Sequence, residues 1–389
     1  MGRRVEPGGQ LPSSPAGELI GRVEEYCRLG HHRTGTATDL ATGDWLENQL
    51  TGLGAGVHRW QALFDRWVAR SELTDDRGPI PHEPLVYGSL GRIESRSFSV
   101  VQVDRPVVGD AHGLDPWLES DPRPARVAAD PGIRVLVLDG PPGLPVAANR
   151  GVSDPLPSPA IIVPADHVNR LDRARYLIDA QLEPALCEIT TAWMGPPGRP
   201  QVVLTTPLSG WFECAGERGP GVGLLGALLP RLSERYRVAV VACSGHELGH
   251  LGLDTYFEDD IAGATGLIEG APVIHLGASI AATEPGPDGE PVLASSRYAL
   301  VDGPSALVEG IASECRTIDI EVASPDRWPG EGGTWREKHR GPVLSFVGRS
   351  RWFHTAGDVW GVGTTPEALQ ACLGAVERSV DLFLASHLD

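Results

Sequence analysis

Histidines and carboxylates gather in three short segments of the sequence, and together they could bind a metal ion or move protons. The segments contain Glu217; His246, Glu247 and His250; and His354 and Asp358. Carboxylates and imidazoles are ordinary zinc ligands, and a neutral imidazole also serves as a general base near pH 7. The three segments are therefore the first candidates for a functional site.

The middle segment, His246-Glu247-Leu248-Gly249-His250, matches the His-Glu-x-x-His pattern of the zincin metalloproteases. In that pattern two histidines one helical turn apart bind zinc, and the glutamate activates water. The motif here directly follows an apolar strand, and no third ligand follows at metzincin spacing. We therefore favour packing against a neighbouring strand, or contact with solvent, as the role of His250.

The elements that must position these segments follow an α/β pattern. Past residue 200, apolar strands alternate with helices: strands at 201–205, 237–243, 273–276 and 343–347, and helices at 221–229, 247–257 and 366–385. Two further helices are predicted within residues 17–53. This alternation predicts a doubly wound, mostly parallel sheet covered on both faces. Ligands of such sheets bind beyond the C-terminal ends of the strands, where the three segments fall.

The length of 389 residues favours two domains or one domain with an insertion. Residues 1–15 are rich in Gly, Pro and Ser and predict a loose tail. Residues 16–76 and 200–389 predict the α/β domain. Residues 77–199 combine many prolines with short apolar runs, at 99–103 and 134–138 among others, and predict a β-rich insert.

The composition excludes several classes of protein. A formal net charge of −18 argues against general nucleic-acid binding, which needs a basic surface. No run of apolar residues reaches the length of a membrane span. The six cysteines include no Cys-x-x-Cys pair, so neither a disulfide scaffold nor a cysteine zinc cluster is expected. We expect a cytoplasmic protein; the sequence leaves its oligomeric state open.

Several motifs resemble the co-catalytic zinc aminopeptidases, a family that includes bacterial leucyl aminopeptidases, glutaminyl cyclases and the metal-free transferrin-receptor ectodomain. Ser244-Gly245-His246-Glu247-Leu248-Gly249 resembles the family's Ser-Ala-Glu-Glu-x-Gly segment. Phe353-His354-Thr355-x-x-Asp358 resembles its closing Tyr-His-Thr-x-x-Asp, and weaker likenesses cover 33–36 and 216–222. The resemblance implies a zinc-peptidase-like α/β domain, in which 77–199 takes the place of a protease-associated-type module.

The chain departs from the family at several metal positions. Neither Thr206-Pro207-Leu208-Ser209, around the expected early histidine, nor 275–279, around a later aspartate, supplies a usual ligand. His275 could substitute for the missing ligand, but its position in a predicted strand suggests packing. The resemblance thus implies one zinc ion held by Glu217, Glu247 and His354. The alternative is a relic site in which Glu217 pairs with Arg218 and Asp358 holds His354.

His246 occupies the position of the family's catalytic glutamate. It could be the general base, a further metal ligand, or a sign of lost activity. Under the catalytic hypothesis, Asp358 orients His354 from outside the metal shell. The nearby aromatic residues could wall an apolar substrate pocket, although such residues are more often packed in a core: Trp211, Phe212, Trp335 and Trp352.

The leading hypothesis is a zinc-dependent hydrolase of an amide or peptide bond, a metallopeptidase of the aminopeptidase kind, although enzymatic activity itself stays uncertain. Its partner would be a small molecule or a peptide. One alternative is a non-catalytic binding or scaffold relative that lost the dimetal centre. Another is a cyclising acyltransferase like the glutaminyl cyclases.

Overall fold

The computed structural model describes residues 14–388 except for 104–132, 139 and 153–158. The predicted tail therefore lies almost wholly outside the described residues. Ser14 and Pro15, the last two residues of the predicted tail, instead form the start of the first helix. Ser14 accepts a hydrogen bond from the backbone N–H of Gly17, and Pro15 is the first helical residue. Both are favourable at a helix start.

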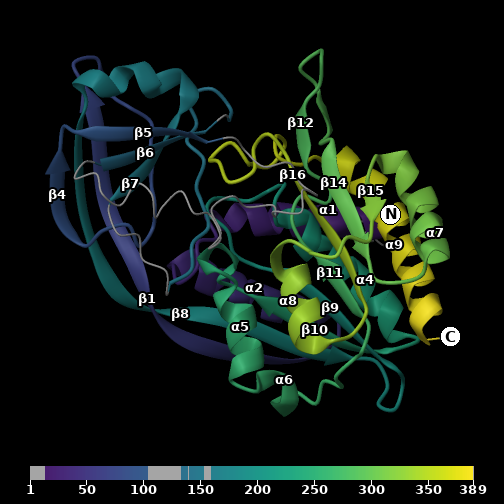
Figure 1. The fold of residues 1–389 in the computed structure, drawn as a ribbon. Coiled ribbons are helices and arrows are strands. Elements are labelled where there is room, and N and C mark those ends of the chain that lie inside the picture. Colours follow the sequence, from purple (N-terminus) through teal and green to yellow (C-terminus); the bar gives the residue numbers. More distant parts are fainter. Residues whose placement is uncertain (1–13, 104–132, 139, 153–158, 389) are drawn as a thin grey trace, which may run out of the picture.

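A ten-stranded mixed sheet runs through the molecule (Figure 1). Its strand order is β15-β14-β16-β11-β9-β10-β8-β1-β2, and β4 also pairs with β8. The strands are β1 (Gly56–Asp75), β2 (Gly78–Pro79), β4 (Gly91–Ser95), β8 (Arg175–Met194), β9 (Gln201–Pro207), β10 (Arg237–Cys243), β11 (Val273–Leu276), β14 (Ser296–Val301), β15 (Glu321–Ala323) and β16 (Val343–Arg349). The four neighbours β16, β11, β9 and β10 are parallel, as predicted.

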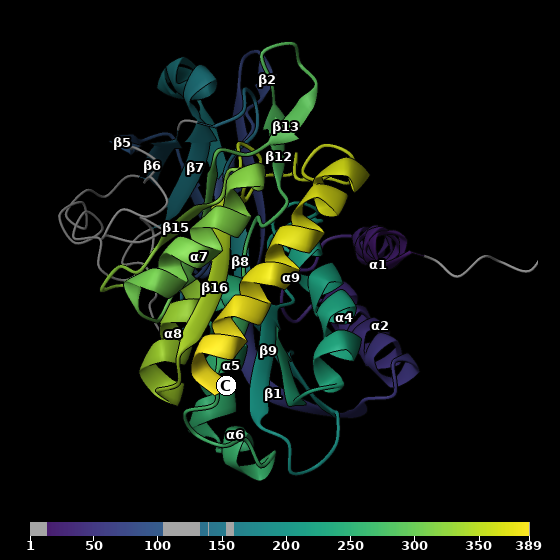
Figure 2. The same cartoon turned by 90° about the vertical axis from the view of Figure 1, so that its right-hand side faces the viewer.

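Helices cover both faces of this sheet (Figures 1 and 2). The larger core cluster lies under α1 (Pro15–Leu29), α2 (Ala37–Gly52), α4 (Gly219–Ser233), α7 (Ser305–Cys315) and α9 (Pro366–Leu388). The opposite cluster lies under α5 (Leu251–Glu258), α6 (Ile261–Ala264) and α8 (Gly330–His339). Buried apolar side chains on both faces explain why the central strands are continuous apolar runs.

The two longest strands, β1 and β8, are antiparallel and pair from Gly56↔Trp193 to Thr74↔Arg175. At one end β8 also pairs with β10, and so both strands belong to the large sheet. The sequence pattern placed residues 175–194, which form β8, inside the predicted insert, whereas β8 belongs to the large sheet. The boundaries of the insert at 77 and 199 stay a prediction. The 20-residue length of these strands is the main feature that the sequence pattern missed.

A four-stranded sheet lies beside the outer part of β1 and β8. It contains β3 (Glu83–Pro84), β7 (Ala160–Pro164), β6 (Ile133–Leu138) and β5 (Phe98–Val103), followed in sequence by the 3₁₀ helix η1 (Ala165–Arg173). The remaining short elements are the hairpin β12 (Thr283–Pro285) and β13 (Pro291–Leu293), and the 3₁₀ helices η2 (His246–Leu248) and η3 (Arg316–Ile318). Several of these short strands lie within residues 77–199; the insert itself and its likeness to a protease-associated module stay predictions.

Helix α4 matters most for the site because Glu217 and Arg218 immediately precede it. It packs closely against α1: a Cβ on Gly223 would lie 2.6 Å from a methyl carbon of Val23. Glycine therefore permits this approach. The helix extends beyond the predicted range of 221–229, and Pro230 lies inside it.

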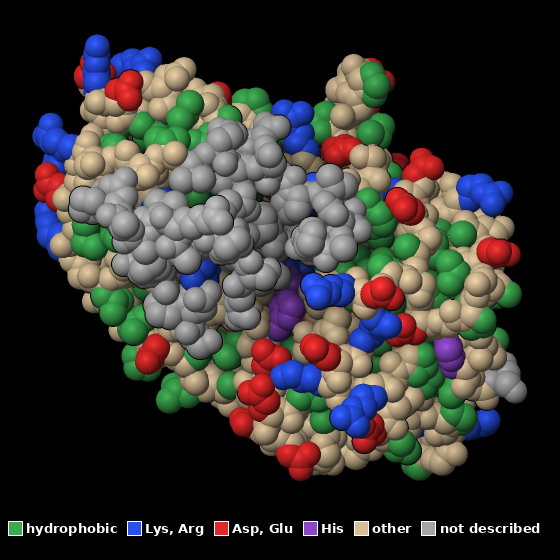
Figure 3. All heavy atoms as spheres, in the orientation of Figure 1, with side chains coloured by type: hydrophobic (Ala, Val, Ile, Leu, Met, Phe, Trp, Pro, Cys, Tyr) green, Lys and Arg blue, Asp and Glu red, His purple; other side chains and the backbone are tan. Residues whose placement is uncertain are grey.

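On the face drawn in Figure 3, basic and acidic side chains of the described residues are interspersed, and neither kind forms one large patch. Among the described helices, none is both long and apolar enough to cross a membrane.

Candidate functional site

The candidate residues gather at one edge of the large sheet, as the strand order predicts. The parallel strands β9, β10, β11 and β16 end at Pro207, Cys243, Leu276 and Arg349. Because parallel strands end on the same side, the segments that follow them meet there. Glu247 follows β10, His354 follows β16, and Glu217 is carried by the loop between β9 and α4.

Glu217, Arg218 and His354 form a buried cluster. The Arg218 Nη2 atom lies 2.8 Å from Glu217 Oε1, and His354 Nε2 lies 3.3 Å from the same oxygen. Arg218 is fully buried and Glu217 is 2% exposed. Burial alone would raise the pKa of Glu217, but Arg218 and His354 outweigh it and hold the pKa at about 2. Glu217 is therefore an ionised carboxylate neutralised by the guanidinium.

Asp358 fixes the loop that carries Glu217. Its two carboxylate oxygens accept hydrogen bonds from the backbone N–H groups of Gly216 and Glu217, at 2.7 and 3.0 Å. The expectation that Asp358 orients His354 is thereby corrected. His354 has a left-handed backbone with φ of 59°, and its Nδ1 faces the carbonyl of Ala147 at 3.2 Å.

Glu247 is fully buried and turns both oxygens toward the start of the chain and the loop after β9. One oxygen accepts from the backbone N–H of Thr34 at 2.7 Å, and the other from the Ser209 hydroxyl at 2.7 Å. Thr34 and Ser209 also accept hydrogen bonds from the N–H of Gly245. Sequence reasoning missed this network, although Thr34 lies in the 33–36 segment that resembles the family.

The His246–His250 segment is not the continuous helix expected over 247–257. The 3₁₀ helix η2 ends at Leu248, Gly249 and His250 have left-handed backbones, and α5 begins at Leu251. The two imidazoles stack with centroids 5.0 Å apart, and His250 Nδ1 lies 3.1 Å from the Thr334 hydroxyl. A zincin requires two histidines that project from adjacent turns of one helix, and the geometry here is different.

His246 faces a carboxyl group that sequence reasoning missed. Its Nδ1 lies 3.1 Å from Glu331 Oε1, at the start of α8. Burial lowers the pKa of His246 well below its usual value, and nearby Arg218 lowers it further. Burial also raises the pKa of Glu331 to about 8. Both groups are therefore neutral near pH 7, and His246 is a weak base.

His275 lies within β11, as its sequence position indicated, and is 2% exposed. The Ser345 hydroxyl lies 2.8 Å from its Nδ1. Burial lowers the pKa of His275 to about 3, so the ring is neutral. When Ser345 donates to Nδ1, the proton of the imidazole lies on Nε2, which has no hydrogen-bond partner among the described residues.

The aromatic residues predicted to wall a pocket are mostly packing residues. Trp335 is fully buried in the core under α5 and α8. Trp211 belongs to the core beneath the small sheet, and Phe212 packs against the same core. Trp352 packs against Gly357, where a Cβ would lie 2.7 Å from its ring. The aromatic residue that lines the cavity described next is Phe353.

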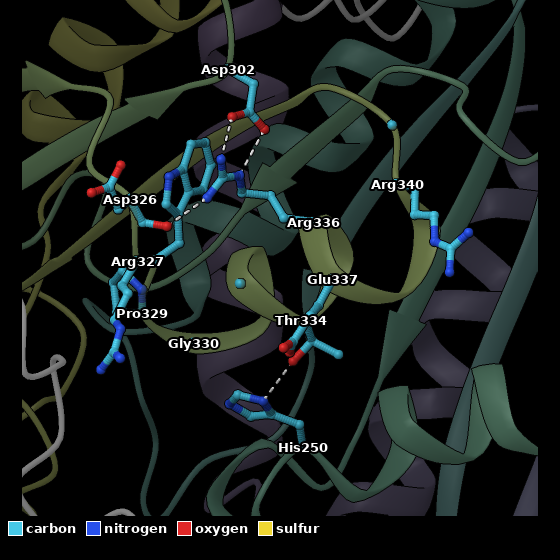
Figure 4. Close-up of a pocket in the computed structure, with 13 residues that line it drawn as sticks. His250, Asp302, Asp326, Arg327, Pro329, Gly330, Thr334, Arg336, Glu337 and Arg340 are labelled. Carbon is cyan, nitrogen blue, oxygen red and sulfur yellow. Dashed lines mark hydrogen bonds and ion pairs between the residues drawn. The ribbon is translucent and has the colours of Figure 1, made fainter.

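A small cavity of about 30 Å³ lies at the centre of the site. Its walls combine polar and apolar groups: Asn149, Pro207, Arg218, His246, His250, His275, Gly277, Ala278, Gly330, Glu331, Val347 and Phe353. His250 and Gly330 also line a larger groove of about 860 Å³ (Figure 4). In that groove Arg336 pairs with Asp302 at 2.9 Å and lies over the Trp328 ring.

The three predicted zinc ligands do not fit an ion as they are arranged. Glu217 is occupied by Arg218 and His354, while both oxygens of Glu247 accept hydrogen bonds from other groups. Within the described part of the chain, no three His, Cys, Asp or Glu side chains are grouped to hold a metal. A buried guanidinium beside Glu217 supplies the positive charge that a cation would otherwise provide.

Comparison with known proteins identifies the fold. No protein-family model matches the sequence, and no curated protein matches it significantly. Among solved structures, a zinc aminopeptidase from Bacillus subtilis matches with a TM-score of 0.68 at 14% identity, over 96% of this chain and 95% of the other. An aminopeptidase from Aneurinibacillus sp. strain AM-1 matches with 0.63 at 13% identity, over 95% and 93%.

A peptidase M28 precursor from Shewanella amazonensis also matches, with a TM-score of 0.63 at 15% identity, over 96% of this chain and 95% of the other. The chain therefore has the fold of the zinc aminopeptidases. The likeness inferred from the sequence motifs is confirmed at that level.

Replacing Glu331 by glutamine tests the raised pKa. A carboxyl whose pKa rises from 4.5 to about 8 on folding makes its full contribution to the free energy of unfolding below pH 4.5. That stability is lost as the pH rises through 8. Glutamine cannot ionise, so the melting temperature of Glu331→Gln relative to wild type should rise between pH 5 and pH 9, by a few degrees at most.

The exposed Glu337 on the same helix provides the control. Thermal unfolding of Glu337→Gln should differ from wild type by the same amount at every pH. An equally flat profile for Glu331→Gln would show that Glu331 is not buried as a neutral acid.

Proposed function

We propose that this chain is a metal-independent ligand-binding protein built on the zinc-aminopeptidase fold. The observation that carries the proposal is the place of Arg218, fully buried and 2.8 Å from the carboxylate that the family resemblance assigns to the metal. A zinc ion at Glu217 would have to share that carboxylate with a guanidinium. Repulsion between two buried cations disfavours this arrangement strongly.

The state of His246 supports the same proposal. A general base works best with a pKa near the operating pH, whereas burial and Arg218 lower the pKa of His246 well below its usual value. Glu247 is held by Thr34 and Ser209, so its role in this structure is to join the segment around Thr34 and the loop after β9 to the segment after β10.

A second candidate is the zinc-dependent amide hydrolase expected from the sequence. It is favoured by the fold, which is that of zinc aminopeptidases, and by the contact between Glu217 and His354. In this alternative Glu217, Glu247 and His354 would hold one ion, which would polarise the scissile carbonyl. His246 would accept a proton from the attacking water. The cyclising alternative stays a prediction.

Metal content separates the two candidates. Protein purified without chelator should contain less than about a tenth of an equivalent of divalent metal, and EDTA should leave its melting temperature unchanged. Elemental analysis and thermal unfolding with and without EDTA provide the measurements. Zinc near one equivalent, together with a fall in melting temperature in EDTA, would favour the hydrolase.

In that event His246→Ala decides the mechanism. Loss of a general base would lower kcat by roughly 10²–10⁴-fold and leave the zinc content unchanged. His250→Ala is the matched control, since His250 contacts Thr334 and is assigned no part in metal binding.

A further inference from the structure

We propose that the small cavity binds the carboxylate group of a small organic acid, with Arg218 as its main partner. The inference deepens the proposed function and rests on it, since it requires a site free of metal. It concerns the cavity of about 30 Å³ between the ends of β9 and β11, the segment after β16, η2 and α8.

The first argument is the hydrogen-bonding state of Arg218. Its Nε donates to the carbonyl of Ser209 at 2.9 Å, and its Nη2 pairs with Glu217. Both Nη1 and Nη2 are buried, and neither has a hydrogen-bond partner among the described residues. A buried donor on a charged group is costly when unpaired, and a carboxylate oxygen is its strongest complement.

A second residue with an unpaired buried nitrogen lines the same cavity. His275 lines it, and its Nε2 carries the proton when the Ser345 hydroxyl donates to Nδ1. This nitrogen also has no hydrogen-bond partner in the described part of the chain. Arg218, which immediately precedes α4, and His275, in β11, thus offer two donors to one acceptor group.

The size and the walls of the cavity favour a carboxylate over a larger oxyanion. A volume of about 30 Å³ accommodates roughly two atoms the size of a water oxygen, which matches the two oxygens of a carboxylate. Apolar atoms of Pro207, Val347 and Phe353 lie beside the donors and suit the carbon next to a carboxylate. The four oxygens of phosphate or sulfate would need more room.

The rest of the acid has an exit. His250 and Gly330 line both the cavity and the larger groove, and Figure 4 shows His250 at the bottom of the view, facing Thr334, with Gly330 beside Pro329. The groove is lined mainly by polar and charged side chains, including Asp326 and Arg327. A small acid with a polar substituent would therefore place its carboxylate at Arg218 and its substituent in the groove.

Propionate and propionamide are suitable probes because they have the same shape and differ in charge. Calorimetric titration and thermal unfolding, both in EDTA, should show saturable binding of propionate with a dissociation constant between about 0.1 and 10 mM. Propionamide, phosphate and sulfate should bind at least about tenfold more weakly.

Because substitution of Arg218 itself would destabilise the fold, the variants are His275→Leu, which removes a donor, and Ala278→Leu, which fills the cavity. Each should weaken propionate binding by about tenfold or more while retaining a cooperative unfolding transition. Arg28→Gln removes a positive charge on the exposed part of α1 and should bind propionate as wild type does.

Three results would overturn the inference: no saturation by propionate up to about 50 mM, far above the range expected for so small a ligand; equal binding of propionamide; or unchanged binding by both cavity variants. If the protein is metal-free and one of these results is found, the carboxylate site fails alone. If propionate binds only before EDTA treatment, bound metal is responsible, and the proposed function fails with it.

Discussion

Replacing Arg218 by methionine is expected to lower the free energy of unfolding by about 3–5 kcal/mol. The substitution removes one partner of a buried ion pair and leaves the Glu217 carboxylate without its guanidinium, with His354 Nε2 3.3 Å away. Methionine fills similar space, so most of the loss should come from the unpaired charge. Chemical denaturation at pH 7 measures the difference.

The expected loss depends on pH in a definite direction. Because Arg218 and His354 hold the pKa of Glu217 at about 2, the carboxylate stabilises the folded wild type above its unfolded pKa near 4.5. This stability is lost as the pH falls toward 2. Without Arg218 the pKa rises and that contribution disappears, so the deficit of the variant should be largest at neutral pH and shrink below pH 4.5.

The double variant Glu217→Gln/Arg218→Met is the control. With both charges removed, much of the stability should return, because neutral groups replace a buried ion pair at little net cost. A single Arg218→Met variant as stable as wild type would contradict the buried pair, and with it the assignment of Arg218 as the replacement for a metal.

Gly216→Ala is expected to destabilise the protein by about 3 kcal/mol or more. An added Cβ would lie 2.1 Å from the carbonyl oxygen of Gly363 and 2.9 Å from Asp358 Oδ1. Both neighbours are fixed: Gly363 by its backbone, and Asp358 by the two N–H groups it accepts. Relief of the clash must therefore move the loop that carries Glu217, and denaturant unfolding should report the loss.

Gly52→Ala provides the comparison. Gly52 is the last residue of α2, and an added Cβ there would meet no atom within 4 Å. Alanine should leave stability unchanged or raise it by up to about 1 kcal/mol, because it restricts the unfolded chain. Similar losses in both variants would show that close packing at Gly216 is not the cause.

Much of the α/β domain could be predicted because its signals are local. Strands β10 (Arg237–Cys243) and β11 (Val273–Leu276) have the predicted bounds, since both are short apolar runs between polar residues. Strands β1 and β8 were missed for the opposite reason. Their exposed and buried positions alternate irregularly, and their pairing joins residues more than a hundred positions apart, which no local window contains.

The sequence predicted where the site lies in the fold, but not which contacts its side chains make. The strand ends correctly brought Glu217, Glu247 and His354 to one edge of the sheet, and the motifs indicated the zinc-aminopeptidase fold. The direction of each side chain depends on tertiary packing. The sequence did not indicate that Glu247 turns to Thr34 and Ser209, or that Glu331 of the unpredicted helix α8 faces His246.

The pairing of β1 with β8 has a consequence for how fast the chain folds. Their nearest described partners, Thr74 and Arg175, close a loop of about a hundred residues, and the pairing continues outward from there to Gly56 and Trp193. Contacts between residues so distant in sequence form late and slowly. We expect refolding to be limited by the docking of these two strands, because β1 is joined to the rest of the large sheet through its pairing with β8.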